Sequence, residues 1–279
     1  MNEGEETRTP TVSVIVPTRN SARTLDHCLA SIRAQTYPSV ELIVVDNHSQ
    51  DATVEIAGKY ADKLEHAGPE RSAQRNHGAR TATGEYLAII DSDMVLTPNV
   101  VSECVATADR EHADAVVIPE RSVGEGFWAA CKALERSCYV GDETVEAPRF
   151  YSRTAFEGFG GYDEEMTGPE DWDLPARMRG AVRFGRTDAE ILHLEGRLTL
   201  RGSVRKKFYY GRQFGGYIRR HPELARQQLR LVRPAFVRHR RRLARKPLLA
   251  AGMLVMKMVE LTAGAAGLLS SRGSGDSRD

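Results

Sequence analysis

The chain has 279 residues, of which 41% are apolar and 28% charged, so it can bury a sizeable core as one large domain or as a domain with an appendage. Its 39 Lys and Arg residues balance 38 Asp and Glu residues, so overall charge does not mark it as a binder of polyanions. The four cysteines form no Cys-x-x-Cys pair, as is typical of a reduced, cytosolic protein, and residues 1–10 show no signal-peptide pattern. We expect residues 1–10 and 271–279 to be disordered.

The first predicted element is a β-branched strand, residues 11–16, which Pro17 closes. Residues 17–20 form the loop at its carboxyl end, and a helix with leucines at helical spacing begins after Ser21. A second strand, residues 41–45, runs directly into Asp46. This strand–helix–strand spacing predicts a right-handed parallel βαβ unit, and therefore an α/β fold.

Asp46 lies where a nucleotide-binding α/β fold places an acid that accepts hydrogen bonds from a base or ribose. Either Asp46 or Asp51 could instead cap the next predicted helix, residues 53–60; we favour the cap for Asp51 and the ligand role for Asp46. Neither strand is followed by Gly-x-Gly-x-x-Gly, and no Walker A sequence is present, which argues against a dinucleotide enzyme.

The next predicted helix, residues 72–81, follows Arg71 and carries Arg75 and Asn76. Arg71 and Arg75 are four residues apart and therefore share a face. Guanidinium groups suit phosphate recognition, although a solvated helix face is the more common fate of such charges.

An apolar run, residues 86–90, ends in Asp91, Ser92 and Asp93. The run is typical of a buried strand, and side chains two residues apart in an extended segment point the same way. Both carboxylates can therefore face one hard cation, Mg²⁺ or Mn²⁺, which leaves room for phosphate oxygens. The alternative is that both aspartates are turn residues.

Beyond this strand the sequence predicts helices at 98–111 and 124–140 and strands at 115–118, 149–153 and 191–194. Glu170, Asp171 and Asp173 surround a tryptophan at a predicted helix start. Like charges at that spacing raise one another's pKa, as a general base requires, but acids at a helix N-terminus are also stabilising for structural reasons. His193 lies in the last strand; a single histidine is more often a satisfied core residue than a ligand.

Six short motifs occur in a fixed order: Val14-Ile-Val-Pro-Thr-Arg-Asn20, Val44-Val-Asp-Asn-x-Ser-x-Asp51, Arg75-Asn-x-Gly78, Ile89-Ile-Asp-Ser-Asp93, Gly160-Gly-Tyr-Asp163 and Glu170-Asp-x-Asp-Leu174. In kind, order and spacing they resemble the family 2 glycosyltransferases of the GT-A fold, over residues 11–200. The resemblance implies a single Rossmann-like α/β domain with a mostly parallel central sheet. It also implies transfer of a sugar from a nucleotide diphosphate sugar, most commonly a UDP sugar, to an acceptor hydroxyl with inversion.

The resemblance assigns roles to individual residues of this chain. Those implied to bind the nucleotide sugar are Pro17, Thr18, Arg19, Asn20, Asp46, Asn47, Ser49, Arg75, Asn76, Asp91 and Ser92. Asp46 would hold the base, Arg75 would approach the diphosphate or ribose, and Asp91 would touch the ribose or sugar. Asp93 and His193 would ligate Mn²⁺ or Mg²⁺. Asp171 would be the general base and Glu170 would help to place a substrate; Pro169, where many relatives carry glycine, departs from the pattern.

We expect residues 201–270 to be a helical extension, first basic and then apolar. Residues 197–246 carry 17 Lys or Arg and one acid, and residues 248–269 contain only Lys257 and Glu260 as charges. The length suits a bilayer span, but the two central charges argue against one. We favour attachment to the anionic cytoplasmic leaflet, peripheral or monotopic, which would suit a glycan or lipid-linked acceptor. The alternative is a helix packed on the catalytic domain; nothing in the extension indicates nucleic-acid reading.

Two other functions are compatible with parts of the sequence. One is a non-catalytic nucleotide-sugar-binding or membrane-scaffold protein of the same fold. The other is a phosphatase of the haloacid-dehalogenase type, because Asp91-Ser-Asp-Met-Val95 follows an apolar strand. That motif normally stands near the first strand of its domain, whereas here two complete strands precede it.

Overall fold

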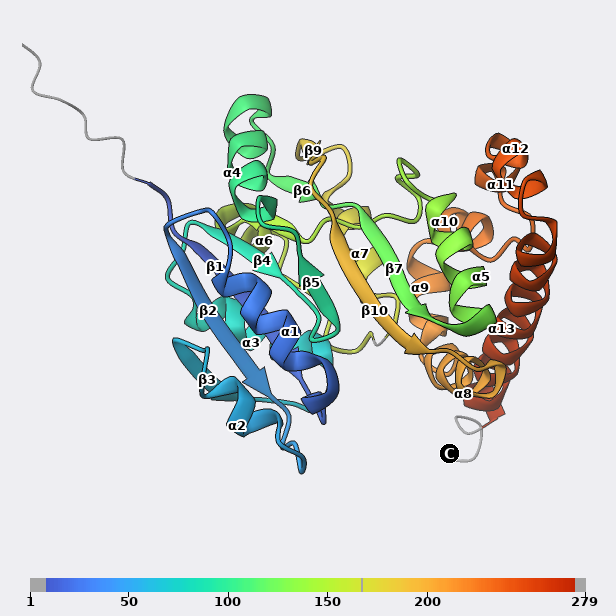
Figure 1. Cartoon of the computed structure of the whole chain (residues 1–279), viewed down its shortest axis with the longest axis horizontal. Coiled ribbons are helices and arrows are strands. Elements are labelled where there is room, and N and C mark those ends of the chain that lie inside the picture. Colours follow the sequence, from blue (N-terminus) through green and yellow to red (C-terminus); the bar gives the residue numbers. More distant parts are fainter. Residues whose placement is uncertain (1–8, 167, 274–279) are drawn as a thin grey trace, which may run out of the picture.

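The computed structural model describes residues 9–166 and 168–273 and contains two β-sheets (Figure 1). The larger sheet has seven strands in the order β3-β2-β1-β4-β8-β6-β9, and the smaller has three in the order β5-β10-β7. The strands of the larger sheet are β1 Val12–Thr18, β2 Val40–Asp46, β3 Lys63–His66, β4 Tyr86–Ile89, β6 Ala115–Val117, β8 Phe150–Ser152 and β9 Phe184–Arg186. Those of the smaller sheet are β5 Met94–Leu96, β7 Glu120–Glu125 and β10 Ile191–Arg197.

Most neighbouring strands of the larger sheet are parallel, as the βαβ spacing predicts; β8 alone runs antiparallel to its two neighbours, β4 and β6. The first helices connect these strands and lie over the sheet: α1 Ala22–Arg33, α2 Thr53–Ala57, α3 Arg71–Thr81 and α4 Val100–Glu111. The α/β fold class with a mostly parallel sheet is therefore confirmed.

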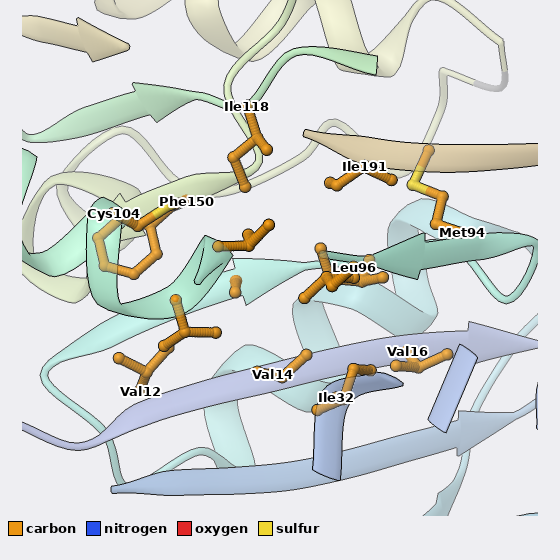
Figure 2. Packing of buried hydrophobic residues seen from close by; sticks show 14 of the residues in the cluster. Val12, Val14, Val16, Ile32, Met94, Leu96, Cys104, Ile118, Phe150 and Ile191 are labelled. Atoms are coloured by element: carbon orange, nitrogen blue, oxygen red, sulfur yellow. The ribbon is translucent and has the colours of Figure 1, made fainter. Parts of the chain in front are cut away.

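The larger sheet is buried on both faces, which is why β1 and β2 are continuous apolar runs. Val12, Val14 and Val16 point to one face, where they pack with residues of α1 and α4 such as Ile32 and Cys104 (Figure 2). Residues that alternate with them, such as Ile15, point to the other face and pack with residues of α3, α6 Arg153–Gly158 and α7 Glu170–Met178. The sheet therefore forms the middle of three layers. Packing on both of its faces holds the carboxyl ends of the parallel strands rigidly in place.

Four strands lie where the sequence gives no strand signal: β3, β5, β7 and β9. Among them, β7 carries Glu120, Arg121 and Glu125 on an edge of the smaller sheet, so its polar residues meet solvent or the site instead of the core. The helix expected at 124–140 therefore begins only at Gly126, as α5 Gly126–Ser137, and the helix expected at 53–60 ends at Ala57.

The extension is helical, as expected. It comprises α8 Leu200–Gly211, α9 Phe214–Arg220, α10 Pro222–Gln228, α11 Pro234–Arg238, α12 Arg240–Ala244 and α13 Pro247–Gly273. The last helix thus passes residue 270, and the remainder of the expected tail, like residues 1–8, lies outside the described residues. Figure 1 shows α13 at the edge of the molecule opposite β2 and β3, beside α5 and α8.

The two faces of α13 differ in chemistry. On the inner face the Lys257 ammonium lies 2.8 Å from Glu135 of α5, and Glu260 lies 3.2 Å from Lys132 of the same helix. Met253 and Met256 join Cys131 and Leu134 of α5 in an apolar cluster. On the outer face the exposed residues are Leu248, Leu254, Val255, Met258 and Leu269. By length and composition α13 could cross a membrane, but Lys257 and Glu260 are paired with residues of α5.

Candidate active site

The carboxyl ends of β1, β2 and β4 lie side by side because these strands are parallel, and two of the predicted loops are tied together there. The N–H of Asn20 donates to Ser49 Oγ at 2.8 Å, and the N–H of Gln50 donates to Asn20 Oδ1 at 2.8 Å. Asn20 has φ 50°, in the left-handed region that asparagine tolerates better than most residues. Asn20 and Ser49 therefore fix the rim of the site to each other.

Asp46 is fully buried at the base of this rim. It accepts hydrogen bonds from Thr18 Oγ1 at 2.8 Å, from the Ser49 N–H at 2.8 Å and from Ser49 Oγ at 2.5 Å. Asn47 is pinned in a different way, since its Nδ2 donates to the Pro69 carbonyl at 2.5 Å. Asp46 thus orders the loop in this structure, and its expected contact with a base stays a prediction.

Asp51 bonds to the starts of two helices. Its Oδ1 accepts from the N–H of Thr53, the first residue of α2, and its Oδ2 accepts from the N–H of Ala22, the first residue of α1. The residue at the α2 cap position is Ala52, so Asp51 acts one residue earlier than expected. This structural role agrees with the preference for Asp51 as the capping acid.

Arg75 lies at the centre of the site and is completely buried. Its Nη2 donates to Asp91 Oδ1 at 2.6 Å and its Nη1 to Asp171 Oδ1 at 2.7 Å. Its guanidinium carbon also lies 5.0 Å from the centre of the Tyr162 ring. One guanidinium from α3 therefore holds the carboxylate at the end of β4 and the carboxylate at the start of α7 in a fixed relation.

Arg149 extends this charge network. Its Nε donates to Glu120 Oε1 at 2.6 Å, and its guanidinium lies 3.5 Å from Asp91 Oδ2 and 3.8 Å from Asp171 Oδ2. Burial alone would raise the pKa of Asp91, but the charges of Arg75 and Arg149 outweigh it and hold that pKa well below its usual range. Asp91 is therefore an anion at every physiological pH.

Asp93 and His193 meet across the boundary between β4 and the smaller sheet. His193 Nε2 lies 3.2 Å from Asp93 Oδ2, and Nδ1 lies 3.3 Å from Glu120 Oε2. Burial by itself would lower the pKa of His193, but the hydrogen bonds to Asp93 and Glu120 outweigh it and raise that pKa to about 9. The histidine predicted from sequence as a ligand candidate is thus beside the predicted aspartate.

Asp93 and His193 suit a divalent cation whose other ligands come from substrate or water. The donors are one carboxylate oxygen and one imidazole nitrogen, a combination that Mn²⁺ accepts, and Glu120 orients the imidazole through its other nitrogen as an outer partner of a metal ligand does. Within residues 9–166 and 168–273 no group of three or more His, Cys, Asp or Glu side chains forms a closed metal site. The remaining ligands would therefore come from substrate or water.

Glu170, the acid expected to help place a substrate, contacts other groups of the protein. Its side chain is fully buried, lies 2.9 Å from Arg71 and 3.6 Å from Arg75, and accepts from the Gly168 N–H. Burial and the neighbouring Asp171 raise its pKa. Asp171 is one-quarter exposed and borders a cavity, so of the two acids only Asp171 is accessible to a substrate hydroxyl.

Two cavities meet at this network. The smaller, of about 200 Å³, is lined by Pro17, Thr18, Arg19, Ser21, Arg71, Gln74, Asp91, Ser92, Asp93, His193 and Lys206. The larger, of about 340 Å³, has Asp171 and Trp172 in its wall and extends between α5, α8 and α13. Arg71, Asp91, His193 and Lys206 line both, so the two cavities adjoin along these four side chains.

Seven of the expected nucleotide-sugar and metal residues line the small cavity: Pro17, Thr18, Arg19, Asp91, Ser92, Asp93 and His193. Six others line neither cavity: Asn20, Asp46, Asn47, Ser49, Arg75 and Asn76. Asn76, for instance, accepts from the Tyr162 N–H at 2.9 Å and donates to the Tyr162 carbonyl at 2.8 Å, so it holds the turn at 160–163.

Several cavity residues were not predicted as site residues. Arg71 and Lys206 line both cavities, and Gln74 lines the small one while donating to the Thr18 carbonyl at 2.9 Å. Arg71 shares a helix face with Arg75, and this spacing is the one sequence feature that points to it. Lys206 comes from α8, where the sequence shows only general basicity, and no local pattern identifies it.

The chain resembles known proteins over part of its length. The profile of the family described as "Glycosyl transferase family 2" matches residues 13–160. Glycosyltransferase AglE of Haloferax volcanii is 41% identical over 93 residues, which cover 30% of this chain and 31% of that protein. Poly(ribitol-phosphate) beta-N-acetylglucosaminyltransferase TarS of Staphylococcus aureus is 33% identical over 122 residues, 40% of this chain and 21% of TarS. The matches thus span a third or less of these relatives.

Solved structures share the fold over nearly the whole chain. The mannosyltransferase PcManGT from Pyrobaculum calidifontis, solved with GDP-Man and Mn²⁺, has a TM-score of 0.61 at 22% identity, covering 96% of this chain and 77% of that one. Residues 1–349 of S. aureus TarS, solved with UDP-GlcNAc, have a TM-score of 0.56 at 17% identity, covering 95% of this chain and 92% of that fragment. At these identities the likeness concerns the fold.

Proposed function

Because the chain belongs to glycosyl transferase family 2, we propose that it transfers a sugar from a nucleotide diphosphate sugar to an acceptor hydroxyl with inversion. One observation carries the proposal: the Asp93–His193 pair and the exposed carboxylate of Asp171 lie on two adjoining cavities, and Asp91 lines both. A donor sugar at that junction would have a place for its leaving group on one side and a base on the other.

The small cavity suits the donor. Arg19, Arg71 and Lys206 bring positive charge to it, and Asp91 and Ser92 bring hydrogen-bonding groups for a ribose or sugar. Asp93 and His193 would hold Mn²⁺ or Mg²⁺, and when bound the cation supplies neutralisation of charge on the departing diphosphate. UDP is our first choice of donor nucleotide, and the UDP-GlcNAc complex of the structural neighbour TarS supports it.

The large cavity suits the acceptor. Asp171 would take the proton of the attacking hydroxyl, and that oxygen would displace the nucleoside diphosphate from the opposite side of the sugar ring. Arg75 and Arg149 hold the Asp171 carboxylate in place, and Glu170 fixes the start of α7 behind it. Glu170 is therefore a positioning residue in this proposal. A single in-line displacement requires no nucleophile from the protein.

We also place the enzyme at the inner face of the plasma membrane, with a glycan or lipid-linked acceptor. The exposed apolar face of α13 and the neighbouring arginines of α11 and α12 support this location. The inward pairing of Lys257 and Glu260 favours a helix that lies along the surface over one that spans it. The haloacid-dehalogenase alternative finds no support, because the chain belongs to a different family.

The test is calorimetric titration of the whole protein with UDP, GDP and dTDP, with and without Mn²⁺, beside Asp93→Ala. We expect one nucleotide to bind in a metal-dependent manner, and Asp93→Ala to abolish that dependence. Asp188→Asn, which removes an exposed carboxylate that lines neither cavity, is the matched control and should bind as the original chain does.

Asp171→Asn separates binding from catalysis. It should bind the nucleotide normally and lose transfer activity by roughly 10²–10⁴-fold, the usual contribution of a general base. Folded protein that binds none of the three nucleotides would overturn the proposal. Nucleotide binding without transfer to any acceptor in membranes, by both the original chain and Asp171→Asn, would instead favour a non-catalytic binding protein of the same fold.

A further inference from the structure

We propose that the large cavity contains an anion-binding subsite centred on Lys207, which seats a phosphate group carried by the acceptor. The inference rests on the proposed function, because it assigns this cavity to the acceptor. It goes further by naming a chemical class: the acceptor is a phosphate-bearing glycan or lipid and not a neutral sugar.

The wall of the large cavity contains basic side chains that form no ion pair with its carboxylates. Eight Lys or Arg side chains and seven Asp or Glu side chains line it. Each of these carboxylates has a basic partner in an ion pair. By contrast, Lys206, Lys207 and Arg233 form no ion pair with any carboxylate in the part of the chain that the structure describes. The unused charge is therefore positive.

Among Lys206, Lys207 and Arg233, Lys207 shows the lack of a partner most clearly. Lys132 and Lys257, its neighbours in the wall, are paired with Glu135 at 2.9 and 2.8 Å, and Lys132 also with Glu260. The Lys207 ammonium has neither a hydrogen bond nor an ion pair to any other residue of 9–166 and 168–273. Burial, and then repulsion by Lys132, lower its pKa to about 8, so it is still largely protonated at neutral pH.

Arg233 adds an unused donor to the same wall. It is only 6% exposed, and its Nε–H has no hydrogen-bond partner among the described residues. Its guanidinium carbon lies 4.9 Å from the centre of the Tyr139 ring, and the Lys257 ammonium lies 5.9 Å from the same ring. Arg233 and Lys257 thus both lie near the Tyr139 ring. Arg233 Nη2 donates to the Gln228 carbonyl, but a buried donor such as the Arg233 Nε–H is unfavourable without an acceptor, and a bound anion would supply one.

The position of this charge relative to Asp171 suits an acceptor. Asp171 lines the large cavity and not the small one, whereas Lys206 lines both. Lys207 and Arg233, like Asp171, line only the large cavity, which is the space that the attacking molecule would occupy in the proposed function. A phosphate seated there would orient its neighbouring hydroxyl without competing for the donor diphosphate.

The experiment measures binding of sn-glycerol 3-phosphate by calorimetry to the whole protein, with Mg²⁺ and saturating nucleotide filling the small cavity. Glycerol is the neutral control ligand. Lys207→Gln should weaken glycerol phosphate binding at least tenfold, the order expected for losing a hydrogen bond to a charged group. Lys207→Arg, which keeps the charge, should restore most of the affinity and guards against a folding defect.

Arg205→Gln is the matched control variant, since it removes the same charge from an exposed position of α8 that lines neither cavity. It should bind glycerol phosphate as the original chain does. Equal affinities of Lys207→Gln and Arg205→Gln, or equal binding of glycerol and glycerol phosphate, would overturn the subsite. Nucleotide titration in the same samples separates the two proposals: Lys207-dependent phosphate binding without nucleotide binding would overturn the donor assignment alone.

A second arm distinguishes the source of the phosphate. Phosphatidylcholine vesicles with and without phosphatidic acid are sedimented with the original chain, with Lys207→Gln and with Arg205→Gln. A lipid-borne phosphate predicts that Lys207→Gln weakens binding to the phosphatidic acid vesicles more than Arg205→Gln does. A glycan phosphate predicts equal vesicle binding together with the tenfold loss for glycerol phosphate.

Discussion

At the residue scale, Glu41 at the start of β2 connects three segments through one carboxylate. It accepts from Ser13 Oγ and from the Thr83 N–H, and its Oε1 lies 2.8 Å from the Lys63 ammonium. Burial alone would raise the pKa of Glu41, but these hydrogen bonds outweigh it and lower the pKa from 4.5 to about 2. The folded state therefore binds this proton more weakly than the unfolded state does.

The consequence is a defined dependence of stability on pH. A carboxyl with a lowered folded-state pKa stabilises the fold fully above its unfolded pKa, so the contribution of Glu41 is complete above about 4.5 and is lost as the pH falls towards 2. Glu41→Gln should lower the midpoint of urea unfolding at pH 7, and the difference from the original chain should shrink between pH 4.5 and 2.5. A difference that stays constant across this range would contradict the assignment.

The structure brings some of the predicted site residues to a cavity and turns others towards the protein interior. Asp93, His193 and Asp171 follow family spacing and lie beside a cavity. Arg75 and Glu170 also match the family motifs, yet they point at other side chains, because the direction of a side chain depends on neighbours that are distant in sequence. Arg75 reaches Asp171, 96 positions away, and no local pattern carries that information.

At the element scale, glycines set the close approach of α8 and α13. A Cβ added to Gly267 would lie 2.2 Å from the Phe208 carbonyl oxygen, and a Cβ at Gly211 would lie 2.2 Å from the Gly264 carbonyl oxygen. Backbone atoms cannot move aside as a flexible side chain can. The two helices therefore pack backbone to backbone at these positions, and α13 is held against the cavity wall.

Gly264 offers a matched comparison within the same helix, because a Cβ there would lie 3.8 Å from the Lys207 carbonyl oxygen, an ordinary contact. Gly264→Ala should stabilise the protein by up to about 1 kcal/mol through helix propensity. Gly267→Ala gains the same propensity but must separate the helices, and should destabilise by roughly 1–3 kcal/mol. Urea unfolding of both variants tests this, and equal shifts would show that the helices pack less closely than described.

Elements with a strong pattern were predicted and those without one were not. The continuous apolar runs of β1, β2 and β4 and the helices α1, α3 and α4 all appear near their expected bounds. By contrast, β7 reads as Glu-Arg-Ser-Val-Gly-Glu and forms a strand because β10 pairs with it along six residues. Pairing with a distant partner decides such a strand, and neither propensity nor alternation reveals it.

At the scale of the whole molecule, the outer face of α13 and the basic helices beside it should bind an anionic bilayer. We expect sedimentation with phosphatidylglycerol vesicles, weakened by added salt because exposed arginines are screened. Joint replacement of Leu254, Val255 and Met258 by serine should lower vesicle binding while the nucleotide affinity stays unchanged. Val140→Ser, at an exposed position outside α13, is the control.

Failure of the serine variant to lower vesicle binding would contradict surface attachment through α13. The sequence left two alternatives open for this helix, membrane association or packing on the domain. The structure shows that its inner face packs on α5 and α8, and the outer face stays available for the proposed attachment. Composition does not separate these alternatives, because it does not reveal which residues of the helix face the domain and which face outward.

The place of α13 in the chain has a consequence for the order of events during synthesis. The strands that build the small cavity are translated before residue 200, whereas Lys257 and Glu260 reach the wall of the large cavity only when α13 has been made. Chain segments generally fold in the order in which they emerge. A growing chain therefore makes the strands of the small cavity first, and the wall of the large cavity closes only when the helix with the apolar outer face has been released.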